Sequence, residues 1–128
     1  MEAQTAPHRS RLVPPNYGPY GNEADALAAL VKRLVAALDP QMIWLFGSRA
    51  RGDARPDSDF DLLVVAKPTG ADWAEDYEKV YAPTMGSGIG VDVVPSDMEV
   101  YEASLGLRTS FIRRIVDEGR MVYGSDPL

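Results

Sequence analysis

Cysteine is absent from the 128-residue sequence, so disulfide bonds and thiolate metal sites are excluded. Histidine is nearly absent: His8 is the only one, and we interpret it as a solvated residue of the N-terminal stretch. Long hydrophobic runs are also missing, since the run from Leu62 to Ala66 is far shorter than the roughly 20 residues of a membrane-spanning helix. The first 22 residues contain no apolar segment of the signal-peptide type. We therefore expect a soluble, cytoplasmic protein without a membrane partner.

Positive charge is scarce relative to negative charge. The chain has 13 Lys and Arg residues against 19 Asp and Glu residues, which gives a net charge of -6. This balance argues against a broad electrostatic grip on nucleic acid, although it is compatible with a local basic patch. With 45% hydrophobic and 25% charged residues, the composition is that of an ordinary globular protein, and the length suits one domain. Nucleic acid is therefore not the expected partner.

The N-terminal stretch differs in composition from the rest of the chain. Residues 1–22 offer few core-forming side chains, and they include the prolines Pro7, Pro14, Pro15 and Pro19. Such a composition predicts a flexible or surface-draped arm outside the domain. We place the domain at 23–128, where it begins with a helix that Asn22 can cap.

Helices and strands are predicted to alternate through the domain. Apolar residues recur at helical spacing over 23–38. Further helices are expected after the capping pairs Asp72/Glu75 and Ser96/Glu99, and over 111–116 with Gly119 as the stop; strands are expected at 41–46, 59–66, 89–95 and 120–124. This order predicts an α/β fold with a small mixed sheet of three or four strands and helices packed on it.

Two aspartates stand at the start of an apolar strand in "FGSRARGDARPDSDFDLLVV". Side chains two apart on a strand share a face and lie about 7 Å apart, so Asp59 and Asp61 project together while Phe60 faces the other way. Asp92 lies in the third predicted strand and joins them if the second and third strands are neighbours. Unpaired carboxylates at this spacing repel each other. Hard divalent cations prefer such oxygen ligands, so we predict a site for Mg²⁺, with Mn²⁺ as the alternative. Two ions roughly 3.5–4 Å apart could serve a phosphoryl-type displacement.

The loop before these aspartates has residues suited to phosphate. Gly47 lets the backbone approach an anion closely, and the Ser48 hydroxyl could donate a hydrogen bond to a phosphate oxygen. Arg49, Arg51 and Arg55 could neutralise a triphosphate. Each feature alone has a simpler explanation: a Gly-Ser pair is usually a turn, an Asp-X-Asp is usually solvated, and loop arginines can pair with neighbouring aspartates. Together they favour a nucleotide and metal site.

The stretch "GSRARGDARPDSDFDLLV" resembles a known signature. Gly47-Ser48, ten residues and then Asp59-Phe60-Asp61 is similar to the motif of the DNA polymerase beta-like nucleotidyltransferase superfamily, and specifically to its minimal nucleotidyltransferase (MNT) family. The likeness extends from the helix at 23 to "FIRRIVDEGRMVYG". The resemblance implies that Gly47 and Ser48 contact the nucleotide phosphates, and that Asp59, Asp61 and Asp92 are the catalytic, metal-binding carboxylates. Arg49 and Arg51 complete the expected nucleotide-binding set.

The resemblance also implies an activity and a partner. Members of the superfamily transfer a nucleoside monophosphate from a nucleoside triphosphate to an acceptor and release pyrophosphate, with two Mg²⁺ ions. Minimal members often act as the antitoxin of a HEPN-domain protein and adenylylate a tyrosine on it. The expected function is therefore transfer of AMP from ATP to a hydroxyl of a HEPN-domain partner protein.

Two alternatives are kept open. One is transfer to a small molecule such as an aminoglycoside, or to an RNA end; relatives of that kind usually carry an additional acceptor domain, and the acidic balance disfavours RNA. The other is an antitoxin that acts by binding alone. Retention of Asp59, Asp61 and Asp92 argues against it, because a pure binder does not need a cluster of like charges.

Overall fold

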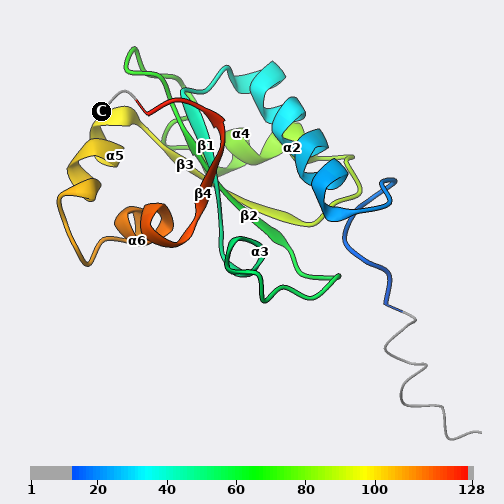
Figure 1. Ribbon diagram of the computed structural model, residues 1–128. Helices are drawn as coiled ribbons and strands as arrows, with labels where there is room; N and C mark the ends of the chain where they lie inside the picture. Colours follow the sequence, from blue (N-terminus) through cyan, green and yellow to red (C-terminus); the bar gives the residue numbers. More distant parts are fainter. Residues whose placement is uncertain (1–12, 127–128) are drawn as a thin grey trace, which may run out of the picture.

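Four strands form one mixed sheet in the computed structural model of the protein, which describes residues 13–126 (Figure 1). The strands are β1 (Met42–Phe46), β2 (Phe60–Val65), β3 (Val91–Ser96) and β4 (Arg120–Gly124), in the spatial order β3-β2-β1-β4. β2 pairs with β3 in parallel, whereas β1 pairs antiparallel with both β2 and β4. The predicted α/β fold with a mixed sheet is confirmed, and the predicted edge strand at 120–124 is its fourth strand.

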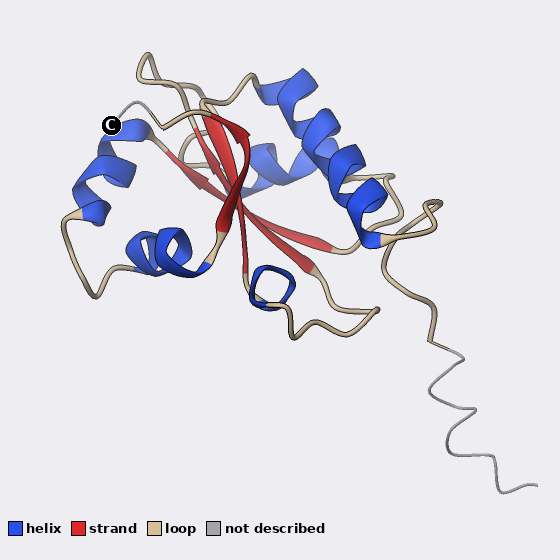
Figure 2. Ribbon diagram, in the orientation of Figure 1, coloured by secondary structure: helices blue, strands red, loops and turns tan. Residues whose placement is uncertain are grey.

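Helices cover both faces of the sheet. They are α2 (Glu23–Leu38), α3 (Ser48–Arg51), α4 (Tyr77–Tyr81), the 3-10 helix η1 (Ala82–Thr84), α5 (Met98–Leu105) and α6 (Phe111–Glu118). Helices α2 and α4 lie on one side of the sheet and α5 and α6 on the other (Figures 1 and 2). Within residues 13–126, no helix is long and apolar enough to cross a membrane.

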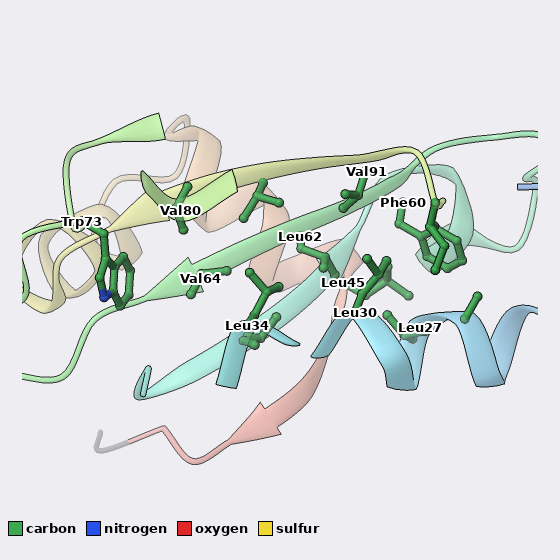
Figure 3. Close-up of a cluster of buried hydrophobic side chains, with 14 of the residues drawn as sticks. Leu27, Leu30, Leu34, Leu45, Phe60, Leu62, Val64, Trp73, Val80 and Val91 are labelled. Atoms are coloured by element: carbon green, nitrogen blue, oxygen red, sulfur yellow. The ribbon is translucent and has the colours of Figure 1, made fainter. Parts of the chain in front are cut away.

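The side chains of β2 alternate between two hydrophobic cores, one on each face of the sheet. Phe60, Leu62 and Val64 pack with the leucines of α2 in the core shown in Figure 3. Leu63 and Val65 join the core beneath α5 and α6. Because side chains alternate along a strand, Asp61 belongs to the α5/α6 face, at the end of the sheet where β2 begins.

Two of the predicted helix caps are wrong by one or more residues. The Asn22 cap of α2 is confirmed, since its side chain accepts a hydrogen bond from the Asp25 N–H at 2.9 Å. For α4, the cap is Asp76 rather than Asp72. The reason is Trp73, which is buried and donates to the Leu38 carbonyl at 3.3 Å, so the chain turns around this anchor before the helix begins.

The cap of α5 is displaced for a different reason. Ser96 was the expected cap, but it pairs with Val65 as the last residue of β3. The next residue, Asp97, is the first one free of the sheet, and its carboxylate accepts from the Val100 N–H. The strand ladder therefore sets where this helix starts.

The stretch before α2 packs on the domain from Asn16 onward. The Asn16 N–H donates to the Pro56 carbonyl at 2.8 Å, and Tyr17 lies against the core beneath α2. The expected arm covered residues 1–22; its part at 13–22 thus contains packed residues, although it forms no helix or strand. Residues 1–12 of that arm, with His8, lie outside the described residues.

Candidate active site

The sheet brings the carboxylates of two strands together. β2 and β3 are neighbours, and their register pairs Asp61 with Asp92. Val91 and Val93 face the core beneath α2, so Asp92 is on the opposite face, with Asp61. Asp61 is half-buried, while Asp92 is exposed. Asp59 stands one residue before β2 and completes a row of three carboxylates at one end of the sheet.

Two glycines make room for these carboxylates. A Cβ atom at Gly47 would collide with the Asp61 carboxylate, and one at Gly90 would run into the Asp59 carboxylate. Gly47 also has a φ of 73°, which L side chains rarely adopt. Asp61 therefore reaches toward the end of β1, whereas Asp59 reaches toward the start of β3.

The surroundings of Asp61 disfavour its ionised form. Burial raises the pKa of Asp61, and the negative charges of Asp92 and Asp59 raise it further. The guanidinium of Arg51 acts in the opposite direction and lowers it. The half-buried carboxylate is therefore only partly compensated by the protein, which is the condition under which a cation binds most favourably.

The donor set is suited to a hard cation. Oxygen atoms are the ligands that Mg²⁺ and Mn²⁺ prefer, and Asp59, Asp61 and Asp92 offer only oxygen. Across residues 13–126, no three Asp, Glu, His or Cys side chains are already arranged to hold a metal ion. This agrees with the opposite directions in which Asp59 and Asp61 reach. The chemistry of the residues fits Mg²⁺, and the carboxylates lie on adjacent strands.

Gly47 and Ser48 follow β1 beside Asp61. β1 ends at Phe46, whose register partner is Asp61, so the next two residues pass directly beside that carboxylate. The short helix α3 then folds back, with the N–H groups of Ala50 and Arg51 donating to the Gly47 carbonyl. Ser48 is half-buried, and its hydroxyl has no hydrogen-bond partner within the described part of the chain.

Arg49 does not have the position predicted for a phosphate ligand. Its side chain is 1% exposed and forms an ion pair with Glu23 at 2.8 Å. Its remaining nitrogens donate to the carbonyls of Pro56, at 2.9 Å, and Ser58, at 2.6 and 3.2 Å. The guanidinium also lies 4.3 Å from the centre of the Phe60 ring. Arg49 therefore fixes the loop before β2 from inside, and its charge is already paired.

Arg51 is the cation of this loop that lies toward the site. Its side chain is 48% exposed and forms an ion pair with Asp53 at 3.3 Å. It is also close enough to Asp61 to lower the pKa of that carboxyl. Arg55 is exposed in the same loop, and its backbone N–H donates to the Ser58 hydroxyl.

Sequence reasoning missed one residue of the site's surroundings. The Asn16 side chain donates to the carbonyls of Ser58, at 2.9 Å, and Gly90, at 2.8 Å, and accepts from the Gly90 N–H at 2.5 Å. It thereby joins the residue before Asp59 to the start of β3. A single asparagine among prolines has no spacing or periodicity that would reveal such a contact.

A pocket of about 280 Å³ opens beside Asp92. Its lining includes Tyr77, Glu78 and Tyr81 of α4, together with Asp92 and Val93 of β3. The two tyrosines are 63% and 42% exposed. A larger apolar groove, of about 640 Å³, lies between α2 and β4 and includes none of the predicted site residues.

The sequence has relatives that fit this geometry. A sequence model of the family described as "Polymerase beta, Nucleotidyltransferase" matches residues 29–128. A protein of Methanocaldococcus jannaschii named "Putative protein adenylyltransferase" is 28% identical over 104 residues, which cover 80% of this chain and 99% of that protein.

Solved structures share the fold. A crystal structure described as a "putative nucleotidyltransferase" from Sulfolobus solfataricus has a TM-score of 0.52 at 22% identity, covering 80% of this chain and 84% of that one. A toxin–antitoxin structure with AMP-PNP has a TM-score of 0.50 at 26% identity, covering 77% of this chain and 73% of that one. Because the family match runs from within α2 to the C-terminus and includes Gly47, Ser48 and the three carboxylates, the chain belongs to the polymerase beta nucleotidyltransferase family and is a nucleotidyltransferase.

Proposed function

We propose that the protein is a metal-dependent adenylyltransferase that moves AMP from ATP to a hydroxyl of a partner protein. The observation that carries the proposal is the group of Asp59, Asp61 and Asp92 at the starts of two adjacent strands, with Asp61 directly beside Gly47. Acids on adjacent strands next to a glycine-serine turn supply both parts of such a site: ligands for Mg²⁺ and a place for the triphosphate.

Each residue has a role in this proposal. Two Mg²⁺ ions, held by Asp59, Asp61 and Asp92, would neutralise the triphosphate and stabilise the attacking and leaving oxygens. The backbone at Gly47 and the Ser48 hydroxyl bind phosphate oxygens, and Arg51 adds positive charge. The acceptor oxygen forms a bond to the α-phosphorus while the bond to the pyrophosphate oxygen breaks. The acceptor proton passes to the Asp92 carboxylate, and pyrophosphate leaves.

The sheet order supports opposite sides of the site for the triphosphate and for the acceptor. Gly47 lies on the β1 side of Asp61, and Asp92 lies on the β3 side. In-line displacement requires the acceptor to approach from the side opposite the leaving pyrophosphate. An acceptor that enters past Asp92 meets the pocket lined by Tyr77 and Tyr81, whereas the triphosphate occupies the β1 side.

The acceptor proposed is a hydroxyl on a HEPN-domain toxin, with this protein as its antitoxin. The Methanocaldococcus jannaschii relative is named as a protein adenylyltransferase, and one structural neighbour is a toxin–antitoxin complex with AMP-PNP. Residues 13–126 make up one sheet with its helices and provide no second domain for a small acceptor.

Transfer from ATP labelled at the α-phosphate tests the proposal. A HEPN-domain protein is co-expressed and co-purified with this chain, and the complex is incubated with labelled ATP and Mg²⁺. The expected result is a partner carrying AMP, located to a tyrosine by mass spectrometry. Asp61→Asn should abolish labelling while the complex still forms. A partner that is unmodified, yet neutralised equally by wild type and Asp61→Asn, would instead indicate inhibition by binding alone.

A further inference from the structure

The segment before α2 contacts the residues that lead into β2 and β3, the two strands beside which the carboxylates lie. Asn16 precedes the family match, which begins at residue 29. Its backbone N–H donates to the Pro56 carbonyl, and its side chain uses both amide hydrogens and the amide oxygen on Ser58 and Gly90. An asparagine side chain that forms three hydrogen bonds to two strand ends is rigidly held.

These bonds lie immediately before the carboxylates. Ser58 is the residue before Asp59, and Gly90 lies two residues before Asp92. The Gly90 carbonyl also accepts the Phe60 N–H at 3.1 Å, the bond that opens the β2–β3 ladder. Asn16 therefore acts at the point where the relative position of the two strands is set. A one-residue slip there would turn Asp92 to the other face of the sheet.

The Asn16 amide is also close to the Asp59 side chain. A Cβ at Gly90 would meet both the Asp59 carboxylate and the amide of Asn16, with the amide atoms at 3.3 Å. The two side chains thus lie on the same side of Gly90. The neutral amide occupies this space without adding another negative charge beside Asp59, which aspartate would do.

We propose that Asn16 is a positioning residue of the nucleotidyltransferase site, which fixes the β2 and β3 starts so that Asp59, Asp61 and Asp92 can share metal and nucleotide. The proposal rests on the proposed function for the role of the carboxylates. It places part of the active-site scaffold in a segment upstream of the residues that the family match covers.

Supporting contacts hold the same segment. Ser58 is shared, because its carbonyl accepts from Asn16 and from Arg49. The Arg49 guanidinium lies 5.4 Å from the centre of the Tyr17 ring, the residue after Asn16. The buried Arg49 and Asn16 therefore both hold the loop before β2, through hydrogen bonds to the same carbonyls of Pro56 and Ser58.

The test compares Asn16→Ala with the matched control Asn22→Ala. Asn22 is in the same segment and caps α2, so its loss destabilises the fold without touching β2 or β3. Binding of Mn²⁺ in the presence of AMP-PNP is measured by electron paramagnetic resonance, well below both melting temperatures. We expect Asn16→Ala to weaken Mn²⁺ binding by about 10–100-fold, the usual cost of losing a support of a metal ligand. Asn22→Ala should bind Mn²⁺ as the wild type does.

Hydrogen exchange provides a readout without metal. In Asn16→Ala, peptides covering 56–62 and 88–92 should exchange faster, whereas those in α2 should not. Asn16→Ser, which retains an acceptor for the Gly90 N–H, is the second variant if Asn16→Ala does not fold, and it should give an intermediate loss of Mn²⁺ affinity.

The outcomes separate this inference from the proposed function. Wild-type protein that binds Mn²⁺ with AMP-PNP but transfers no AMP would refute the proposed acceptor reaction, while a weaker Asn16→Ala complex would still support the positioning role. Equal Mn²⁺ affinity in Asn16→Ala and Asn22→Ala would overturn the role of Asn16. Wild-type protein that binds no Mn²⁺ would overturn it as well, because no metal site would then need positioning.

Discussion

The two arginines of helix α3, Arg49 and Arg51, have different roles. Arg49 and Arg51 are two residues apart in α3, and the sequence alone predicted the same phosphate-binding role for both. The fold turns Arg49 inward, where it pairs with Glu23 and two carbonyls, and leaves Arg51 exposed near Asp61. A helix of one turn cannot present residues two apart on the same side, which explains the difference.

Alanine substitution of these two arginines should therefore affect different properties, stability in the case of Arg49 and nucleotide binding in the case of Arg51. Arg49→Ala removes the ion pair with Glu23 and the hydrogen bonds to the Pro56 and Ser58 carbonyls, and it should lower the free energy of unfolding by about 2 kcal/mol or more. Arg51→Ala should leave stability within about 0.5 kcal/mol, as exposed ion pairs contribute little, but weaken AMP-PNP binding. Urea denaturation and titration calorimetry measure the two effects. Unchanged AMP-PNP affinity in Arg51→Ala would contradict the nucleotide-binding role of Arg51. Unchanged stability in Arg49→Ala would contradict the structural role of Arg49.

Gly47 should tolerate no side chain. Gly47→Ala places a Cβ against the Asp61 carboxylate in a backbone of positive φ, so we expect both lower stability and lost binding of Mn²⁺ and AMP-PNP. Gly52→Ala is the matched control, because Gly52 also has positive φ but a Cβ there meets nothing within 4 Å. It should show only the strain of roughly 1–2 kcal/mol. Equal loss of binding in both variants would mean that contact with Asp61 is not the reason for glycine at 47.

Asp61 should destabilise the metal-free protein. Burial and the charges of Asp92 and Asp59 hold its folded-state pKa above the ordinary 3.8. A carboxyl with a raised pKa supports folding fully below its unfolded value and loses that support as the pH rises through the folded value. Asp61→Asn should thus raise the Tm in EDTA at neutral pH, and the gain should shrink as the pH falls toward about 4. Asp57→Asn, exposed in the same loop, should not show this pattern; an unchanged Tm in Asp61→Asn at every pH would contradict the account.

Helix α4 and strand β3 together form the proposed acceptor side of the site. α4 packs Val80 into the core beneath α2 and leaves Tyr77 and Tyr81 on its outer side, in the pocket that Asp92 also lines. The sequence predicted this helix but placed its cap at Asp72, because a capping pattern does not show that Trp73 is anchored first.

Removing the two tyrosines should affect the acceptor alone. The double variant Tyr77→Ala/Tyr81→Ala should raise the KM for the partner protein without changing the affinity for AMP-PNP, since both side chains lie on the β3 side of the carboxylates. Tyr20→Ala is the control, because Tyr20 is 42% exposed like Tyr81 and lies outside the pocket. Steady-state labelling at varied partner concentration measures the difference. A KM equal to that of the wild type would mean that the partner protein binds at another surface.

The sheet order makes one site of residues far apart in the sequence. Asp92 lies in β3 and Asp61 in β2, and Gly47 follows β1, the next strand of the order β3-β2-β1. The sequence could predict that Asp59 and Asp61 share a face, because strand periodicity is local, and it indicated Gly47 and Ser48 both by their residue chemistry and by the family resemblance. It could make the position of Asp92 only conditional on the strand pairing, which the register of β2 and β3 then satisfied.

Contacts between residues distant in the sequence could not be predicted from such patterns. Asn16 bonds to residues 42 and 74 positions away, and the burial of Arg49 depends on Glu23 in another helix. Neither contact has a period or a spacing. Asn16 supports the site from a stretch whose proline content predicted an arm, because a few well-placed hydrogen bonds can order a segment that has no regular structure.

Joint binding of Mn²⁺ and AMP-PNP is the measurement that tests the central claim most directly. Electron paramagnetic resonance should show Mn²⁺ bound to the wild-type protein when AMP-PNP is present, and excess Mg²⁺ should displace it. Asp61→Asn should lose this binding, while Asp57→Asn, which alters an exposed carboxylate of the same loop, should retain it. Mn²⁺ binding that is unchanged in Asp61→Asn would contradict the assignment of Asp59, Asp61 and Asp92 as one metal and nucleotide site.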